Sequence, residues 1–245
     1  MKLLSWNVRG SGSPRTVRRL RYMLKLRNPQ MVFFVETKIC RSKMERIRYS
    51  CGYVNGIEVD LEGTRGGLYL AWKQEVSITV RHIDMVVDKN ESREHDRSNS
   101  WAELRSLYTE ERFPWFVCGD FNKIMYGFEK RGGVPRDERR MELFQKVLLE
   151  CSLMDMGFSG RWFTWERGNL LETNICERLD RRVANEEWLV MFPEVSIQHL
   201  THSFSNHCPL LVNTRRAEQG VKVADFKFEA WWTMEESFDK KVKHI

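Results

Sequence analysis

Apolar runs of strand length recur along the chain and alternate with segments of helical spacing. Continuous or nearly continuous apolar runs predict strands at 2–7, 31–35, 115–120 and 210–213. Glycine-containing turns separate three further predicted strands, at 53–59, 67–72 and 76–83. Residues 88–100 are wholly polar and predict a loop, because nothing in them can fill a core position.

Five segments predict helices. Ser13 places a capping hydroxyl before Pro14 at the first helical position, and apolar residues then recur at helical spacing as far as Arg27. The other helices are predicted at 43–50, 101–108, 135–151 and 186–191. The irregular alternation of strands and helices favours an α+β or layered α/β domain with mixed sheets over a parallel doubly wound fold.

Polar side chains follow or interrupt several of these apolar segments. The strand at 115–120 ends in Gly-Asp-Phe-Asn, which places a carboxylate and an amide where a rigid strand leaves the core. For any one such residue, a turn or a cap is an equally open interpretation. As a group they match what phosphodiester cleavage needs, namely oxygen ligands for a hard cation, a base for water and hydrogen bonds to phosphate. The group consists of Asn7, Glu36, Asp120, Asn122, Asp180 and His207.

Composition sets the broad class of the protein. A chain of 245 residues with 42% hydrophobic residues can bury the core of one large domain. The six cysteines form no Cys-x-x-Cys pair, which argues against a structural zinc site or a disulfide framework and fits a reducing compartment. No segment has the length and apolarity needed to span a bilayer. We therefore expect a soluble, intracellular protein with no membrane partner.

Positive charge is concentrated at the N-terminus. Residues 1–50 contain 13 Lys and Arg against two acids, Glu36 and Glu45, although the whole chain has a net charge of only +6. Such asymmetry suits a polyanionic partner such as nucleic acid, and it is equally typical of a solvated helix face rich in arginine.

The polar motifs lie at 6–7, 36–38, 119–122, 178–180 and 205–207, and in this order they resemble the endonuclease/exonuclease/phosphatase family. These metal-dependent phosphodiesterases include apurinic endonucleases and DNase I. More narrowly, the segments 4–10, 132–135 and 163–165 resemble the endonuclease domain of plant non-LTR (LINE-type) retrotransposons. The resemblance implies a DNase I-like α/β/β/α sandwich, in which two packed mixed β-sheets are flanked by helices.

The resemblance also implies a domain organisation and partners. It covers residues 1–214 as an endonuclease-like domain, and residues 215–245 resemble the connector to the reverse transcriptase, partly helical or disordered. The chain stops before any polymerase motif, so we expect a reverse transcriptase domain in cis only in a full-length element. DNA is the expected partner, no small-molecule cofactor is expected, and the location implied is nuclear.

Each matched position carries an implied role in the chemistry. Glu36 would be the principal ligand of Mg²⁺ (or Mn²⁺), with Asn7 beside it. Asp120 would orient or deprotonate the attacking water, and Asn122 would hold a phosphate oxygen.

The remaining positions concern the scissile phosphate and the nucleic acid around it. His207 would contact the scissile phosphate, and Asp180 would fix its ring and support its positive charge. The residues expected to contact nucleic acid are Arg9, Arg18, Arg19, Thr164 and Trp165.

Two departures from the family pattern predict weakened or lost activity. The family has an aspartate immediately before the histidine, and Asn206 occupies this position. An amide cannot act as a base, and loss of a proton-transfer group typically costs roughly 10²–10⁴-fold in rate. A strand bearing a phosphate-binding tyrosine is also expected before Trp101, where the polar stretch 90–100 lies instead.

The sequence therefore predicts a Mg²⁺-dependent DNA endonuclease domain of retroelement type, weakened or inactive in this copy. The alternative from another class is a catalytically inactive nucleic-acid-binding remnant. A small-molecule or lipid phosphatase of the same fold is disfavoured by the retroelement-like segments.

Overall fold

A computed structural model describes most of the chain as far as Thr214, namely residues 1–10, 13–37, 41–59, 67–77, 101–102, 104–108, 113–168, 170, 173–201 and 205–214. The longer strands are β1 (Lys2–Asn7), β2 (Met31–Val35), β3 (Asn55–Val59), β4 (Leu68–Trp72), β5 (Phe116–Asp120), β11 (Asp180–Ala184), β12 (Ser196–His199) and β13 (Leu210–Asn213). The short strands are β6 (Lys130–Arg131), β7 (Met154–Asp155), β8 (Ser159–Gly160), β9 (Trp165–Arg167) and β10 (Ile175–Glu177). The helices are α1 (Pro14–Arg27), α2 (Arg41–Ser50), η1 (Gly127–Glu129), α4 (Glu138–Glu150) and α5 (Glu186–Met191).

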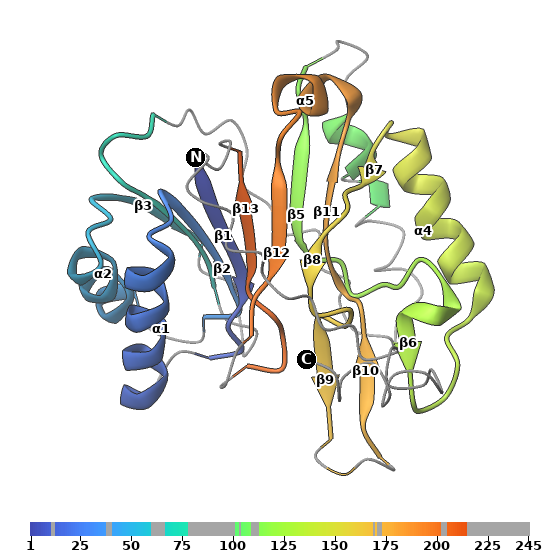
Figure 1. The fold of residues 1–245 in the computed structure, drawn as a ribbon, viewed down its shortest axis with the longest axis horizontal. Coiled ribbons are helices and arrows are strands. Elements are labelled where there is room, and N and C mark those ends of the chain that lie inside the picture. Colours follow the sequence, from blue (N-terminus) through green and yellow to red (C-terminus); the bar gives the residue numbers. More distant parts are fainter. Residues whose placement is uncertain are drawn as a thin grey trace, which may run out of the picture. The chain divides into compact units, whose positions relative to one another are not determined.

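The strands form one large mixed sheet and two small sheets. The large sheet has the order β3-β4-β2-β1-β13-β12-β8, and the small sheets have the orders β5-β11-β7 and β6-β10-β9. Helices α1 and α2 lie outside the large sheet and α4 lies outside the β5-β11-β7 sheet, with the two sheets between them (Figure 1). This arrangement confirms the predicted α/β/β/α class. No helix among the described residues is long and apolar enough to cross a membrane.

Three apolar layers hold these elements together. The first joins α1 and α2 to the large sheet, and its members include Leu20, Met44, Val32 and Phe34. The second lies between the two sheets, and its members include Leu3, Phe33, Phe116 and Ala184. The third joins α4 to the small sheet, and its members include Phe144, Val147 and Val183. Strands β1 and β2 thus bury both of their faces, which is why they were readable as apolar runs.

Side-chain alternation explains why three polar residues meet between the sheets. Successive side chains of a strand point to opposite faces, so residues four positions apart share a face. Asn7, Asp120 and Asp180 each lie four positions from a core residue of the same strand that packs between the sheets. These core residues are Leu3, Phe116 and Ala184.

Agreement between predicted and observed elements varies along the chain. The bounds of β1, β2, β13 and α5 are those predicted, whereas β11 and β12 were not predicted. Strand β11 escaped detection because three of its five residues are charged, although all five are buried. The predicted strand at 76–83 is described only at residues 76–77, which are not in a strand. The predicted gap near 90–100 and the connector at 215–245 lie outside the described residues.

On the α4 side of β11, two arginines are buried in a four-membered ionic network. Arg181 donates to Asp155 Oδ2 at 2.7 Å and also to Glu129, and Arg178 donates to Glu129 Oε1 at 3.0 Å and to Asp155 Oδ1 at 3.0 Å. Each guanidinium therefore bridges both carboxylates. This pairing offsets the cost of burying the charges. It also connects η1, which contains Glu129, to β11.

Arg182, on the opposite face of β11, is buried with much poorer compensation. Its Nη1 lies 3.0 Å from His199 Nε2, while its Nε and Nη2 have no hydrogen-bond partner among the described residues. Burial lowers the pKa of Arg182 to about 10, because the charged guanidinium is less well solvated there than in water.

The two neighbouring arginines should therefore differ in their contribution to stability. Arg181→Met should lower the free energy of unfolding by about 3–5 kcal/mol, because it leaves buried carboxylates underpaired. Arg182→Met should leave that free energy unchanged or raise it by about 1–4 kcal/mol, since a costly buried charge is removed. Urea unfolding of both variants checks the ranking, and an equal loss in both would contradict it.

Candidate active site

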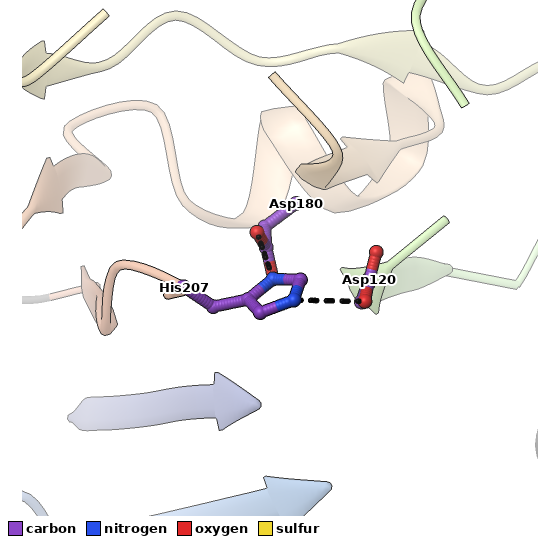
Figure 2. A group of neighbouring side chains, drawn as sticks. All are labelled: Asp120, Asp180 and His207. Carbon is purple, nitrogen blue, oxygen red and sulfur yellow. Dashed lines mark hydrogen bonds and ion pairs between the residues drawn. The ribbon is translucent and has the colours of Figure 1, made fainter. Parts of the chain in front are cut away.

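A buried histidine lies between two carboxylates at one end of the inter-sheet layer. Figure 2 shows Asp120 and Asp180 on either side of the His207 ring. His207 Nδ1 is 2.9 Å from Asp180 Oδ2, and His207 Nε2 is 3.7 Å from Asp120 Oδ2. Asp120 ends β5 and Asp180 begins β11, directly opposite each other in the antiparallel register. Two strands of one sheet thus bring both acids to the imidazole.

The backbone around His207 is fixed by hydrogen bonds from the large sheet. Trp6 Nε1 donates to the His207 carbonyl at 2.8 Å, and the His207 backbone N–H donates to Ser205 Oγ at 3.1 Å. The Ser205 hydroxyl in turn donates to the Asn7 carbonyl at 2.7 Å. The end of β1 therefore positions the histidine, a function of Trp6 and Ser205 that the strand pattern alone did not reveal.

Thr164 holds the other side of the histidine pair. Its hydroxyl accepts from the backbone N–H groups of Leu179 and Asp180 at 3.0 and 2.9 Å, and the side chain is completely buried. This burial leaves Thr164 no surface for nucleic acid, which differs from the role that the sequence implied. Its neighbour Trp165 is half-buried, with its ring centroid 6.5 Å from that of His207.

Asn7 connects the histidine cluster to Glu36. Its amide nitrogen donates to Glu36 Oε1 at 3.0 Å and to Asp120 Oδ2 at 3.1 Å. Glu36 lies just beyond β2, which is the parallel neighbour of β1, so both strands deliver their last residues to the same edge. Arg9 closes this side, with its Nε 3.8 Å from Glu36 Oε2.

Three non-glycine residues at the site have left-handed backbones. The φ angles are 42° at Arg9, 53° at Glu36 and 53° at Asn122. Such conformations are costly and persist where surrounding contacts impose them. Here the Glu36 carbonyl accepts from Gly10 N at 2.8 Å, and the Asn122 N–H donates to Asp120 Oδ1 at 2.9 Å. The turns after β1, β2 and β5 are thus shaped around the site.

Residues 4–207 match the Endonuclease/Exonuclease/phosphatase family. The chain belongs to this family. No curated protein sequence matches the chain significantly.

Solved structures show the same fold at low sequence identity. The 3′ phosphatase NExo from Neisseria is 14% identical, with a TM-score of 0.62 over 88% of this chain and 100% of its own. The endonuclease domain of TRAS1, a telomere-specific non-LTR retrotransposon, is 14% identical, with a TM-score of 0.59 over 89% and 99% of the two chains. An AP endonuclease from Archaeoglobus fulgidus is 17% identical, with a TM-score of 0.57 over 87% and 98%.

Burial and neighbouring charges shift the pKa values of Asp120 and His207. Burial, helped by the charge of Asp180, raises the pKa of Asp120 to about 6, although His207 acts in the other direction. Burial alone would lower the pKa of His207, but the charges of Asp180 and Asp120 outweigh it and raise that pKa to about 9. At neutral pH the imidazole is therefore a cation between two acids.

The donor set around Asn7 fits a hard divalent cation. Turning its amide by 180° would place the amide oxygen between carboxylate oxygens of Glu36 and Asp120, and carboxylate and amide oxygens are the ligands such cations prefer. Asp120, Asp180 and His207 also offer ligand atoms within 4.8 Å of one another. Of these residues, Glu36 and Asn7 could hold such a cation without displacing His207 from Asp180.

The other predicted residues lie in different relations to this centre. Asn122 contacts Asp120 through its backbone N–H, and the Asn206 carbonyl accepts from Glu166 N at 3.0 Å. Arg18 and Arg19 lie on α1, which covers the outer face of the large sheet. The described part of the chain therefore brings Asn7, Arg9, Glu36, Asp120, Asp180 and His207 into one connected cluster.

The buried imidazolium should make stability depend on pH. Because the pKa of His207 is about 9 in the folded protein and 6.5 without the fold, its contribution is complete below pH 6.5 and is lost as the pH rises through 9. Across that window the free energy of unfolding should fall by up to about 1.4 kcal/mol per pH unit. Urea unfolding measures this slope, and His207→Gln is the control that should lack it. An equal slope in both proteins would contradict the assignment.

Proposed function

We propose that the chain is a Mg²⁺-dependent DNA endonuclease of retroelement type whose hydrolysis of phosphodiester bonds is weakened by Asn206. The observation that carries this proposal is the buried His207 held between Asp180 and Asp120, with Asn7 linking Asp120 to Glu36. The contacts among these residues support the proposal, because they join an imidazole, three carboxylates and an amide into one connected cluster.

The roles of the residues follow from their contacts. Asp120, with a pKa raised to about 6, can orient a water molecule and accept its proton near neutral pH. His207, protonated and held by Asp180 through Nδ1, can present Nε2 to a phosphate oxygen and stabilise its growing negative charge. We infer from the family resemblance that Asn122, at the turn after Asp120, holds another phosphate oxygen.

Glu36 and Asn7 would hold the divalent cation, Mg²⁺ or Mn²⁺. When bound, such an ion supplies positive charge that neutralises phosphate oxygens and promotes departure of the leaving group. Arg9, whose guanidinium already lies beside Glu36, adds a further positive charge at this edge and can contact the nucleic-acid backbone.

DNA as the substrate is supported by the relatives and by charge. The structures of similar fold include a retrotransposon endonuclease domain, an AP endonuclease and a phosphatase bound to a product DNA hairpin. The excess of basic residues over acids in residues 1–50 suits the same partner. A reverse transcriptase domain in cis and a nuclear location follow from the retroelement resemblance and are part of the proposal.

Asn206 favours a second candidate function, a nucleic-acid-binding remnant without catalysis. Aspartate and asparagine have nearly the same shape, so the site assembles with either, but only the carboxylate adds negative charge beside the imidazolium and the ion. The two candidates thus differ in chemistry and share one architecture.

Nicking of supercoiled plasmid in Mg²⁺ separates these candidates. The unmodified chain should nick weakly or undetectably, and Asn206→Asp should raise the rate by at least about 10-fold. Adding Glu36→Ala to the Asn206→Asp variant, or adding EDTA, should abolish this gain, which excludes a contaminating nuclease. DNA binding without nicking by Asn206→Asp would favour the remnant, and strong nicking by the unmodified chain, abolished by Glu36→Ala, would refute the weakening.

The arginines of α1 should contribute to the salt dependence of DNA binding. Replacing Arg18, Arg19 and Arg21 with glutamine should flatten the slope of log affinity against log salt by about 0.9 for each phosphate that these arginines neutralise. The matched control replaces Arg139, Arg140 and Lys146 on α4, and it should leave the slope unchanged. Equal slopes in the unmodified chain and the α1 variant would identify the α1 arginines as a solvated helix face.

A further inference from the structure

Three aromatic side chains form a continuous exposed row, which we call the aromatic ladder: Tyr126, Phe128 and Trp162. They are 44%, 65% and 47% exposed. The rings of Tyr126 and Phe128 are stacked, with centroids 5.1 Å apart and planes within 10°, and the Phe128 and Trp162 centroids are 6.0 Å apart. Large aromatic rings are rarely left at the surface in contact with one another unless they bind something.

The ladder is held rigidly from below. The backbone N–H groups of Met125 and Tyr126 donate to Glu129 Oε2, and Glu129 is buried in the ionic network with Arg178 and Arg181. At the other end, Phe158 packs on Trp162 with a centroid distance of 5.8 Å. Phe158 is itself fixed by stacking on His199 and by the guanidinium of Arg178 over its ring. A preformed surface of this kind loses little conformational entropy when it binds a ligand.

The ladder is connected to the proposed active site through the backbone between Trp162 and Trp165. Trp162 precedes Trp165 by three residues, so their Cα atoms are at most about 11 Å apart. Trp165 pairs with His207 through an isolated β-bridge. This upper limit corresponds to no more than about three steps along a nucleic-acid strand at roughly 3.4 Å each. A strand whose scissile phosphate lies at His207 can therefore reach the ladder with its neighbouring nucleotides.

Positive charge beside the ladder favours nucleic acid over an apolar partner. The exposed Arg131 places its guanidinium 5.3 Å from the ring centroid of Phe163, the neighbour of Trp162. Arg161, on the other side of Trp162, is also exposed and lies 3.5 Å from Glu166. Aromatic faces bordered by arginines are the usual platform for unpaired bases, because every base has a face to stack and a phosphate to neutralise.

We propose that the aromatic ladder binds unpaired nucleobases adjacent to the cleavage site. This inference rests on the proposed function, because it places the ladder on the path of the same DNA strand. Bases within an intact duplex stack on each other and do not offer their faces, so the ladder distinguishes DNA with a single-stranded segment from fully paired DNA.

Equilibrium binding in EDTA, which prevents cleavage, tests the proposal. The probes are a short blunt duplex and two versions of that duplex, each with a single-stranded tail of about four nucleotides at one of its two ends. The tail that reaches the ladder should raise affinity by roughly 5- to 150-fold, the range expected for stacking of one base. A fluorescent base analogue in that tail should be quenched on binding.

Variants separate stacking from other effects. The double variant Phe128→Ala with Trp162→Ala should lose the gain from the tail and keep the affinity for the blunt duplex. Phe128→Leu, which keeps apolar area without an aromatic face, should lose much of the gain. Tyr49 on α2 is a comparably exposed aromatic, 61% exposed. Its replacement, Tyr49→Ala, should leave the gain in affinity from the tail unchanged.

Each remaining outcome refutes a defined statement. Equal affinity for blunt and tailed duplex, or a gain that persists in the double variant, overturns the role of the ladder and leaves the proposed function standing. Absence of binding to both probes overturns the proposed function and the inference with it. A dimer that dissociates on Phe128→Ala, with no gain from the tail, makes the ladder an interface between copies and overturns its role in DNA binding.

Discussion

The site depends on the pairing of protonated His207 with Asp120 and Asp180. Asp120 and Asp180 are directly opposite on neighbouring strands and both are buried, an arrangement in which like charges repel. The imidazolium offsets that repulsion because it contacts both carboxylates. The neutral hydrogen bonds from Trp6, Ser205 and Thr164 then decide where this cation and its acids lie. The charges stabilise the cluster, and the neutral hydrogen bonds fix its geometry.

The packing of two sheets explains how the chain can place so many charges in its interior. Strand β11 has one face toward the large sheet and one toward α4, so adjacent residues of β11 enter different environments. Arg181 faces α4 and meets Glu129 and Asp155, whereas Asp180 faces the inter-sheet layer and meets His207. The buried charges are thus divided into two groups by the backbone itself, and each group is close to neutral.

Sequence patterns predicted the parts of this structure that depend on local or apolar signals. The bounds of β1 and β2 followed from their apolar runs, and α1 followed from its Ser13 cap and Pro14. The polar residues of the site were singled out because each follows or interrupts an apolar segment. Strand β11 could not be recognised in this way, because the side-chain partners of its buried arginines lie 17 to 52 residues away in the sequence. Likewise, the inward role of Thr164 depends on backbone groups that no local pattern identifies.

In the proposed function, the amide at position 206 affects the chemistry more than the architecture. The backbone at this position is held by a hydrogen bond from Glu166 N to the Asn206 carbonyl, and on either side Ser205 and His207 are held by Asn7 and Trp6. None of these contacts needs a charge at residue 206. Because neutral bonds preserve the arrangement, the fold and the cluster are retained with an amide where the family pattern has a carboxylate. The backbone carbonyl of Asn206 therefore contributes to the fold, whereas in the proposed function its side chain affects the reaction.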